Sequence, residues 1–112
     1  PVWCRNVSNE YDLIIAVANW PRPRREVFRT LLRARAMENL SYVIGVNRVG
    51  EDPNRLVYSG DSVIIDPRGK ALVEAEEGAD TVITATLDYA PLQDLRQKFP
   101  VWADADPFLL QI

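Results

Sequence analysis

The only cysteine of the chain, Cys4, is the first residue whose chemistry could support catalysis. A cysteine nucleophile reacts as the thiolate and usually works with a histidine base, but none of the 112 residues is a histidine. Arg5 could favour the thiolate and Glu10 could accept a proton, yet neither forms a recognised catalytic spacing with Cys4. We therefore interpret Cys4 as a structural or bystander thiol.

Asn19 and Trp20 are the candidate substrate-binding residues. They follow an almost continuous apolar run, residues 12–18, which is typical of a strand covered on both faces in a layered α/β protein. Pro21 and Pro23 end the strand, because proline donates no backbone hydrogen bond. Open α/β sheets gather their ligand-binding groups at the carboxyl ends of such strands. A tryptophan that only fills the core is an equally good interpretation of Trp20.

Closely spaced arginines raise the question of nucleic-acid binding. They are Arg22, Arg24, Arg25, Arg29, Arg33 and Arg35. Glu26 and Glu38 interrupt the series, and the formal net charge of the chain is −3, so we expect a solvated arginine face and no nucleic-acid partner. Arg35 instead falls on the apolar side of the predicted helix. Because a buried arginine needs a partner, we predict a buried polar network of Arg35, Glu38 and Asn39.

Helices and strands of a mixed α/β unit are expected to position these groups. Phe28, Leu31, Leu32 and Ala36 recur at helical spacing and predict a helix over residues 24–40. Strands are predicted over residues 42–47, 56–65 with a break at 60–62, 71–75 and 81–87, and a second helix over 91–98. Turn-forming residues fill 50–54 and 66–69. The apolar tail, residues 99–112, is expected to dock on another surface.

The composition narrows the class of protein. Hydrophobic residues make up 47% of the chain and charged residues 26%, an ordinary globular balance. No apolar run approaches the ~20 residues that span a bilayer, so we expect a soluble protein with no membrane partner. One cysteine forms no internal disulfide, and no cysteine cluster of the metal-binding type is present. We therefore expect a cytoplasmic location and no metal site.

Several motifs occur along the chain in a characteristic order. They are Pro1-Val2-Trp3, Ala18-Asn19-Trp20-Pro21, the stretch LLRARAMEN at 31–39, Asn47-Arg48-Val49-Gly50, Gly60-Asp61-Ser62 and Ile65-Asp66-Pro67-Arg68-Gly69. Together they resemble the C-terminal half of the nitrilase, or carbon-nitrogen hydrolase, superfamily. The closing stretches KFPVW and DADPF look like its bacterial omega-amidase branch, whose members hydrolyse 2-oxoglutaramate and related omega-amides.

The resemblance implies a fold and an assembly. Residues 1–112 are expected to be the C-terminal half of a carbon-nitrogen hydrolase domain, with the N-terminal half absent. That half is an α/β structure, the C-terminal part of a nitrilase-type four-layer αββα sandwich. Members of the family pair through helices, so the helix over residues 24–40 and the apolar tail are the candidate contacts of a homodimer.

The resemblance also implies a chemistry without a cofactor. A cysteine thiolate attacks the amide of a small molecule, a glutamate moves protons and a lysine stabilises the oxyanion. All three residues are expected outside this chain, the nucleophile just before Pro1, so the isolated chain should be inactive and supply one pocket wall through Asn19 and Trp20. Relatives often have His-Trp where Val27-Phe28 stands, which leaves the amide substrate open. The alternative is a non-catalytic member that keeps the fold for binding or assembly.

Overall fold

The longest helix confirms the prediction made from the spacing of apolar residues. The computed structural model describes residues 2–109, and within them α1 spans Arg25–Asn39. Phe28, Leu32 and Ala36 are buried on one side of α1, as i,i+4 spacing requires. Leu40 ends the helix in the left-handed conformation at φ 41°, and its N–H returns to the carbonyls of the last turn.

A four-stranded sheet in the order β1-β2-β5-β6 forms the body of the structure. β1 (Leu13–Ala18) and β2 (Tyr42–Asn47) are parallel, and α1 connects the end of the first to the start of the second. β5 (Val63–Ile65) and β6 (Ala71–Glu74) extend the sheet with antiparallel pairing. The strands predicted over 12–18, 42–47 and 71–75 and the break at 60–62 are confirmed.

The hydrophobic core lies between α1 and one face of this sheet. Its buried members are Phe28, Leu32, Ala36, Val43, Val63 and Ile65. Gly45 of β2 allows the helix to approach closely, because a Cβ on this glycine would lie only 2.4 Å from Cδ1 of Leu32. Ile14, Ala16 and Ala18 of β1 pack against the same core.

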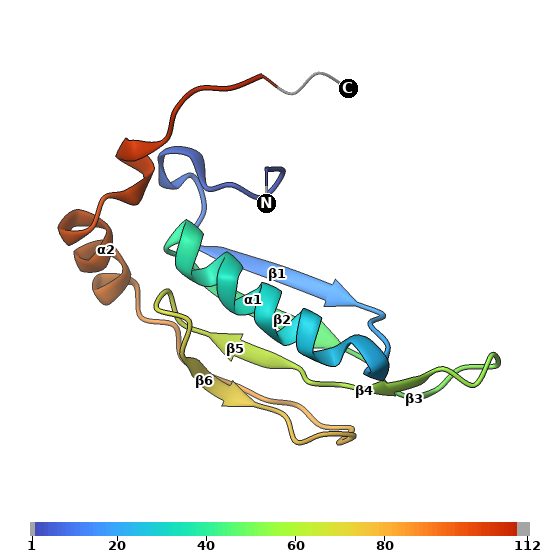
Figure 1. The fold of residues 1–112 in the computed structure, drawn as a ribbon. Helices are drawn as coiled ribbons and strands as arrows, with labels where there is room; N and C mark the ends of the chain where they lie inside the picture. The colour runs from blue at the N-terminus through green and yellow to red at the C-terminus, as the bar shows by residue number, and fades with distance from the viewer. Residues whose placement is uncertain (1, 110–112) are drawn as a thin grey trace.

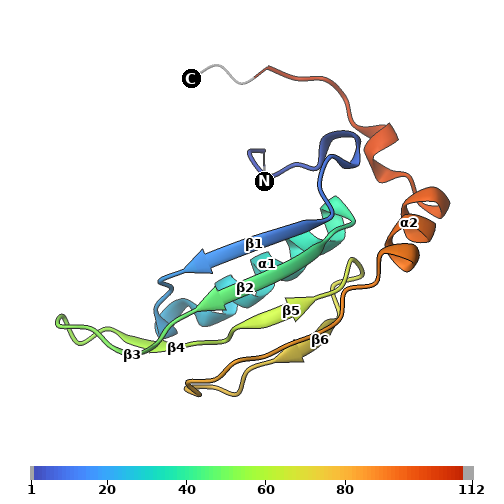
Figure 2. The same ribbon diagram turned by 180° about the vertical axis from the view of Figure 1, so that it is seen from behind.

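The opposite face of the sheet has no helix against it in residues 2–109, as the two views in Figures 1 and 2 show. Ile15 and Val46 are exposed there, and Val17 is 82% exposed. The prediction that the apolar run at 12–18 is covered on both faces is therefore wrong for the described residues. Alternate side chains of β1 point to opposite faces, and residues 2–109 cover only one of them.

The connections differ from prediction in two places. Residues 50–54 do not form only a turn, because β3 (Val49–Glu51) and β4 (Val57–Ser59) pair in a hairpin that projects beyond the main sheet (Figure 1). The strand predicted over residues 81–87 is wrong: this stretch leads from β6 to α2 and pairs with no described strand. Short 3-10 helices are η1 (Val7–Asn9), η2 (Arg22–Arg24) and η3 (Val101–Asp104).

Helix α2 (Tyr89–Lys98) confirms the second helix and begins at Asp88, whose carboxylate accepts the N–H of Ala90 at 3.1 Å. Arg96, only 4% exposed, fixes α2 to the rest of the chain. It donates to the carbonyls of Leu40 at 3.0 Å and Tyr11 at 2.7 Å and to the Asp12 carboxylate at 2.5 Å. None of the helices in residues 2–109 has the length and apolar character that a membrane span requires.

The apolar tail docks only in part. Its 3-10 helix η3 contacts η1 and α1, whereas Phe108 and Leu109 are exposed. Residues 110–112, which belong to the same predicted docking segment, lie outside the described residues.

Candidate functional site

The carboxyl ends of β1 and β2 bring together residues that are distant in sequence. The two strands are parallel and Ala18 is in register with Asn47, so Asn19 and Trp20 leave the sheet beside the end of β2. The loop between β4 and β5, with Gly60 and Ser62, reaches the same point. We call Asn19, Trp20, Asn47, Gly60 and Ser62 the carboxyl-edge cluster.

Asn47 connects the members of this cluster. Its side-chain Oδ1 accepts the backbone N–H of Trp20 at 2.8 Å, and its Nδ2 donates to the carbonyls of Trp20 at 2.9 Å and Gly60 at 2.8 Å. The Asn47 backbone N–H donates to Oγ of Ser62 at 3.0 Å, and this hydroxyl lies 3.2 Å from the Asn47 carbonyl, to which it donates. Every hydrogen-bonding group of the Asn47 side chain therefore has a partner in the cluster.

The two predicted binding residues are placed differently. The Trp20 ring is half-buried and stacks on Phe28 with 5.8 Å between ring centroids, while its Nε1 donates to the Arg24 carbonyl at 2.7 Å. The Arg24 guanidinium lies 5.1 Å from the Trp20 ring centroid, within cation–π range. Asn19 is exposed. Part of the Trp20 ring thus belongs to the core, as the alternative interpretation expected, whereas Asn19 faces outward and is accessible to a ligand.

The β4–β5 loop, which carries Gly60 and Ser62 of the cluster, is held by a buried carboxylate. The side chain of Asp61 is 3% exposed; it accepts hydrogen bonds from Nη2 of Arg25 at 2.5 Å and from the Ser59 hydroxyl at 2.5 Å. Burial disfavours the ionised Asp61, but hydrogen bonds from Arg25 and Ser59 and the charges of Arg25 and Arg29 outweigh that effect and hold the pKa of this carboxyl below its usual value. Asp61 is therefore a charged anchor for the loop at neutral pH.

The arginine face of α1 is not simply solvated, so that prediction is wrong in part. Carboxylates from the loops and strands beside α1 cover it: Arg25 pairs with Asp61 and Glu77, and Arg33 pairs with Glu74 at 3.0 Å. Hydrogen bonds to Asp61 and Glu77 are the main reason that the pKa of Arg25 is raised. Acidic groups spaced along β6 and its flanking loops match arginines spaced four residues apart, and this pairing is not visible within the helix sequence alone.

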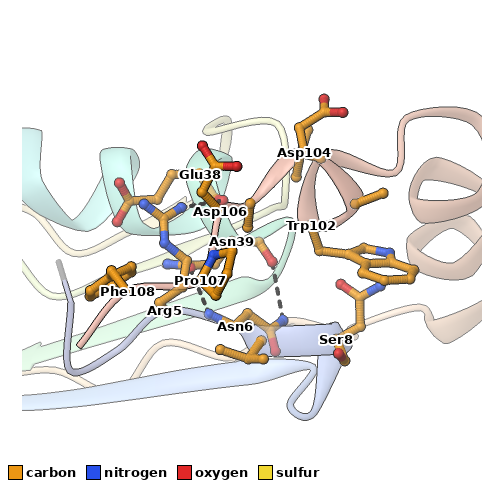
Figure 3. A pocket seen from close by; sticks show the side chains of 15 residues that line it. Arg5, Asn6, Ser8, Glu38, Asn39, Trp102, Asp104, Asp106, Pro107 and Phe108 are labelled. Carbon is orange, nitrogen blue, oxygen red and sulfur yellow. Dashed lines mark hydrogen bonds between the residues drawn. The ribbon is translucent and has the colours of Figure 1, made fainter.

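The predicted network at the other end of α1 is present but only partly buried, because the side chains of Arg35 and Glu38 are 17% and 29% exposed. Arg35 and Glu38 form an ion pair, and Asn39 is buried and donates to the Arg35 carbonyl at 2.9 Å. The Asn39 side chain also accepts the backbone N–H of Asn6 at 3.0 Å. Glu38, Asn39 and Asn6 line a cavity of about 890 Å³ between the N-terminal segment and the tail. Figure 3 shows these side chains in the pocket wall.

Cys4 lies at this second end of the molecule, not at the carboxyl edge. The Tyr11 hydroxyl donates to the Cys4 carbonyl, and Tyr11 precedes the start of β1. Burial is the main reason that the pKa of Tyr11 is raised. The six residues of β1 separate this end from Asn19, a span of about 20 Å at ~3.3 Å per residue. Within residues 2–109 no group of three or more metal-ligating side chains is gathered.

From the sequence we predicted Asn19 and Trp20 at this edge but not Asn47 or Asp61. At the end of β1, the rule that ligand groups gather at the carboxyl ends of strands gives Asn19 and Trp20. Asn47 ends the neighbouring apolar strand, so the same rule could have found it. Nothing in the local sequence of Asp61 shows that Arg25, which is 36 residues away, is its partner.

Comparison with known proteins identifies similar chains. A family model described as carbon-nitrogen hydrolase matches residues 2–97. The omega-amidase YafV of Escherichia coli strain K12 is 51% identical over 110 residues, which cover 98% of this chain and 43% of that protein. The 2-oxoglutaramate amidase of Bacillus subtilis is 35% identical, covering 93% of this chain and 40% of its own length.

A solved structure has a fold very similar to that of this chain. XC1258 of Xanthomonas campestris, a carbon-nitrogen hydrolase superfamily protein, superimposes with a TM-score of 0.93 at 45% identity, covering 99% of this chain and 44% of its own. The chain therefore spans less than half the length of these relatives.

Proposed function

The chain belongs to the carbon-nitrogen hydrolase family and has its α/β fold, and on that premise we propose that the complete protein is an omega-amidase. Its substrate is the omega-amide of a small 2-oxo or carboxylic acid, and its products are the acid and ammonia. The observation that carries the proposal is the 51% identity to an omega-amidase across 98% of this chain.

The reaction runs through a thioester. A cysteine thiolate outside this chain attacks the amide carbonyl, the C–N bond breaks, and the nitrogen leaves as ammonia after it takes a proton from a glutamate. Water then attacks the thioester carbonyl, which releases the carboxylic acid and restores the thiol. No oxidant, metal or other cofactor enters this balance.

Residues 1–112 form the C-terminal half of the catalytic domain in this proposal. The open sheet face with Ile15, Val17 and Val46 is covered in the complete protein by the second sheet of the four-layer sandwich. Asn19 and Trp20 form one wall of the substrate pocket at the carboxyl edge. Among the described residues no carboxylate forms an ion pair with Arg24, so its charge beside Trp20 is available to the carboxylate of an acidic substrate.

The location and assembly are further parts of the proposal. The protein is cytoplasmic, acts without nucleic-acid or membrane partners and forms a homodimer. Val27 and Leu31 support an interface on α1, because both are exposed apolar residues one helical turn apart. Sedimentation of the complete protein as a monomer at micromolar concentration would contradict the homodimer.

Ammonia release tests the activity. The complete protein should release ammonia from 2-oxoglutaramate, and the isolated chain of residues 1–112 should release none. Failure of the complete protein on 2-oxoglutaramate and other omega-amides would refute the proposal and favour the alternative, a non-catalytic member that binds or assembles. Sequencing the residues before Pro1 separates the two, since only the enzyme requires a cysteine there and a glutamate and lysine farther upstream.

A further inference from the structure

We propose that Asn47 is a positioning residue that sets the substrate wall by fixing the backbone of Trp20, and through it Asn19. This inference rests on the proposed amidase function and assigns a role to Asn47, which opens one of the ordered motifs but has no role that the sequence alone predicts. Asn47 is not proposed to touch the reacting atoms. It acts through Asn19 and Trp20, the two residues that follow β1 at the carboxyl edge.

The Asn47 side chain pairs with the backbone of Trp20 beyond the last residues that β1 and β2 pair with each other. Backbone pairing between β1 and β2 ends at Ala18 and Asn47, two residues before Trp20. Beyond that point the Asn47 amide group accepts the Trp20 N–H at 2.8 Å and donates to the Trp20 carbonyl at 2.9 Å. A side-chain amide has the same donor and acceptor as a peptide group, so it continues the pairing past the end of the strand.

The groups that hold Asn47 are themselves hydrogen-bonded to neighbouring elements. Its second amide hydrogen goes to the Gly60 carbonyl at 2.8 Å, and its backbone exchanges hydrogen bonds with the Ser62 hydroxyl. Gly60 has φ +76°, and a Cβ on it would lie 2.9 Å from Cγ1 of Val49, so the loop passes close to β3 at a position that favours glycine. Asp61, between Gly60 and Ser62 in the sequence, forms an ion pair with Arg25 on α1.

Asn19 is consequently held from both sides. Ala18 before it is in the sheet ladder and Trp20 after it is bonded to Asn47, while the Asn19 side chain is exposed. Its amide can donate to a substrate carboxylate or accept from a substrate amide, and either bond needs a fixed backbone to be selective. The Arg24 guanidinium over the Trp20 ring supplies the adjacent positive charge.

Asn39 offers a matched control in the same chain. It is a buried asparagine that also binds backbone, accepting the Asn6 N–H at 3.0 Å and donating to the Arg35 carbonyl at 2.9 Å. It lies at the opposite end of α1 from the carboxyl edge. Asn47→Leu and Asn39→Leu therefore make the same chemical change, but only the first removes support from the proposed substrate wall.

The test compares these variants in the complete protein, each alone and combined with Asn19→Ala, with 2-oxoglutaramate as substrate. Both single leucine variants should lower the thermal midpoint. Asn47→Leu should raise KM by about 10- to 100-fold with a smaller change in kcat, whereas Asn39→Leu should leave KM near the wild-type value. In the Asn19→Ala background most of the KM effect of Asn47→Leu should disappear, because the side chain through which it acts is absent.

Equal KM changes in the two leucine variants, or an unreduced Asn47→Leu effect in the Asn19→Ala background, would overturn the inference and leave the amidase function standing. Absence of turnover in the wild-type protein would instead overturn the function and the inference with it. If Asn47→Leu does not fold, Asn47→Asp takes its place, since it keeps the acceptor for Trp20. Amide exchange at Trp20 should quicken in Asn47→Leu, which removes the acceptor of the Trp20 N–H, but not in Asn39→Leu, and unchanged exchange in Asn47→Leu would also refute the inference.

Discussion

Replacing Asp61 with asparagine removes one negative charge from the loop behind the carboxyl edge and changes little else. Asp61 has φ 62°, a left-handed conformation that asparagine also adopts more readily than most residues. The two side chains have nearly the same shape, so the loop keeps its course. Asp61→Asn therefore measures the contribution of the charge to folding stability.

The expected loss follows from the contacts of the carboxylate. Asp61 accepts short hydrogen bonds from Nη2 of Arg25 and Oγ of Ser59, both at 2.5 Å, and a third from Nε of Arg25 at 3.2 Å. Hydrogen bonds to a charged group contribute about 1.5–3 kcal/mol each, and a neutral acceptor keeps roughly half of that. Because Arg25 is partly exposed and solvent screens it, we expect Asp61→Asn to lower the free energy of unfolding by about 2 kcal/mol.

The pH dependence has a definite sign. Asp61 has a lowered pKa in the folded state, so its charge contributes stability above the unfolded value of 3.8 and loses that contribution as the pH falls through the folded pKa. The stability difference between the wild type and Asp61→Asn should therefore be constant from pH 7 to about pH 5. It should shrink as the pH falls below about 4, where the unfolded carboxyl binds its proton.

Urea unfolding of the complete protein between pH 7 and pH 3 measures both effects. Glu77→Gln is the matched control, because Glu77 pairs with the same Arg25 but its side chain is 40% exposed. A change of at most about 0.5 kcal/mol is expected for this surface pair. If Asp61→Asn costs no more than Glu77→Gln, or if its cost is the same at pH 3 and pH 7, the assignment of Asp61 as a buried charged anchor is refuted.

Other substitutions in the complete protein test the packing and the site assignment. Arg96→Met should lower the free energy of unfolding by about 2–4 kcal/mol, because it leaves buried carbonyls without their donor; a midpoint in urea equal to that of the wild type would contradict this. Gly45→Ala should cost about 1–3 kcal/mol, since its Cβ would collide with Leu32, and thermal unfolding at the wild-type temperature would show that α1 can move away freely. Cys4→Ser should leave ammonia release from 2-oxoglutaramate near the wild-type rate, and an inactive but folded variant would show that Cys4 takes part in the chemistry.

The elements with local signals can be predicted from the amino-acid sequence. Helix α1 follows from apolar residues at i, i+3 and i+4, and the central strands follow from short apolar runs between turn-forming residues. The ordered motifs also determined the family. The absence of histidine excluded a Cys-His pair within this chain. The place of Asn19 and Trp20 after β1 could be predicted from the end of the apolar run alone.

Only the tertiary structure decided which groups meet. Arg96 binds Asp12 across 84 residues, Arg25 finds Asp61 across 36, and Asn47 binds Trp20 across 27. Such pairs depend on strand register, on where a loop crosses the sheet and on how closely a helix can approach, and none of these leaves a periodic trace in the sequence. The predicted strand at 81–87 failed for the same reason: residues with strand propensity form a strand only where a partner is available, and no described segment of this chain supplies one.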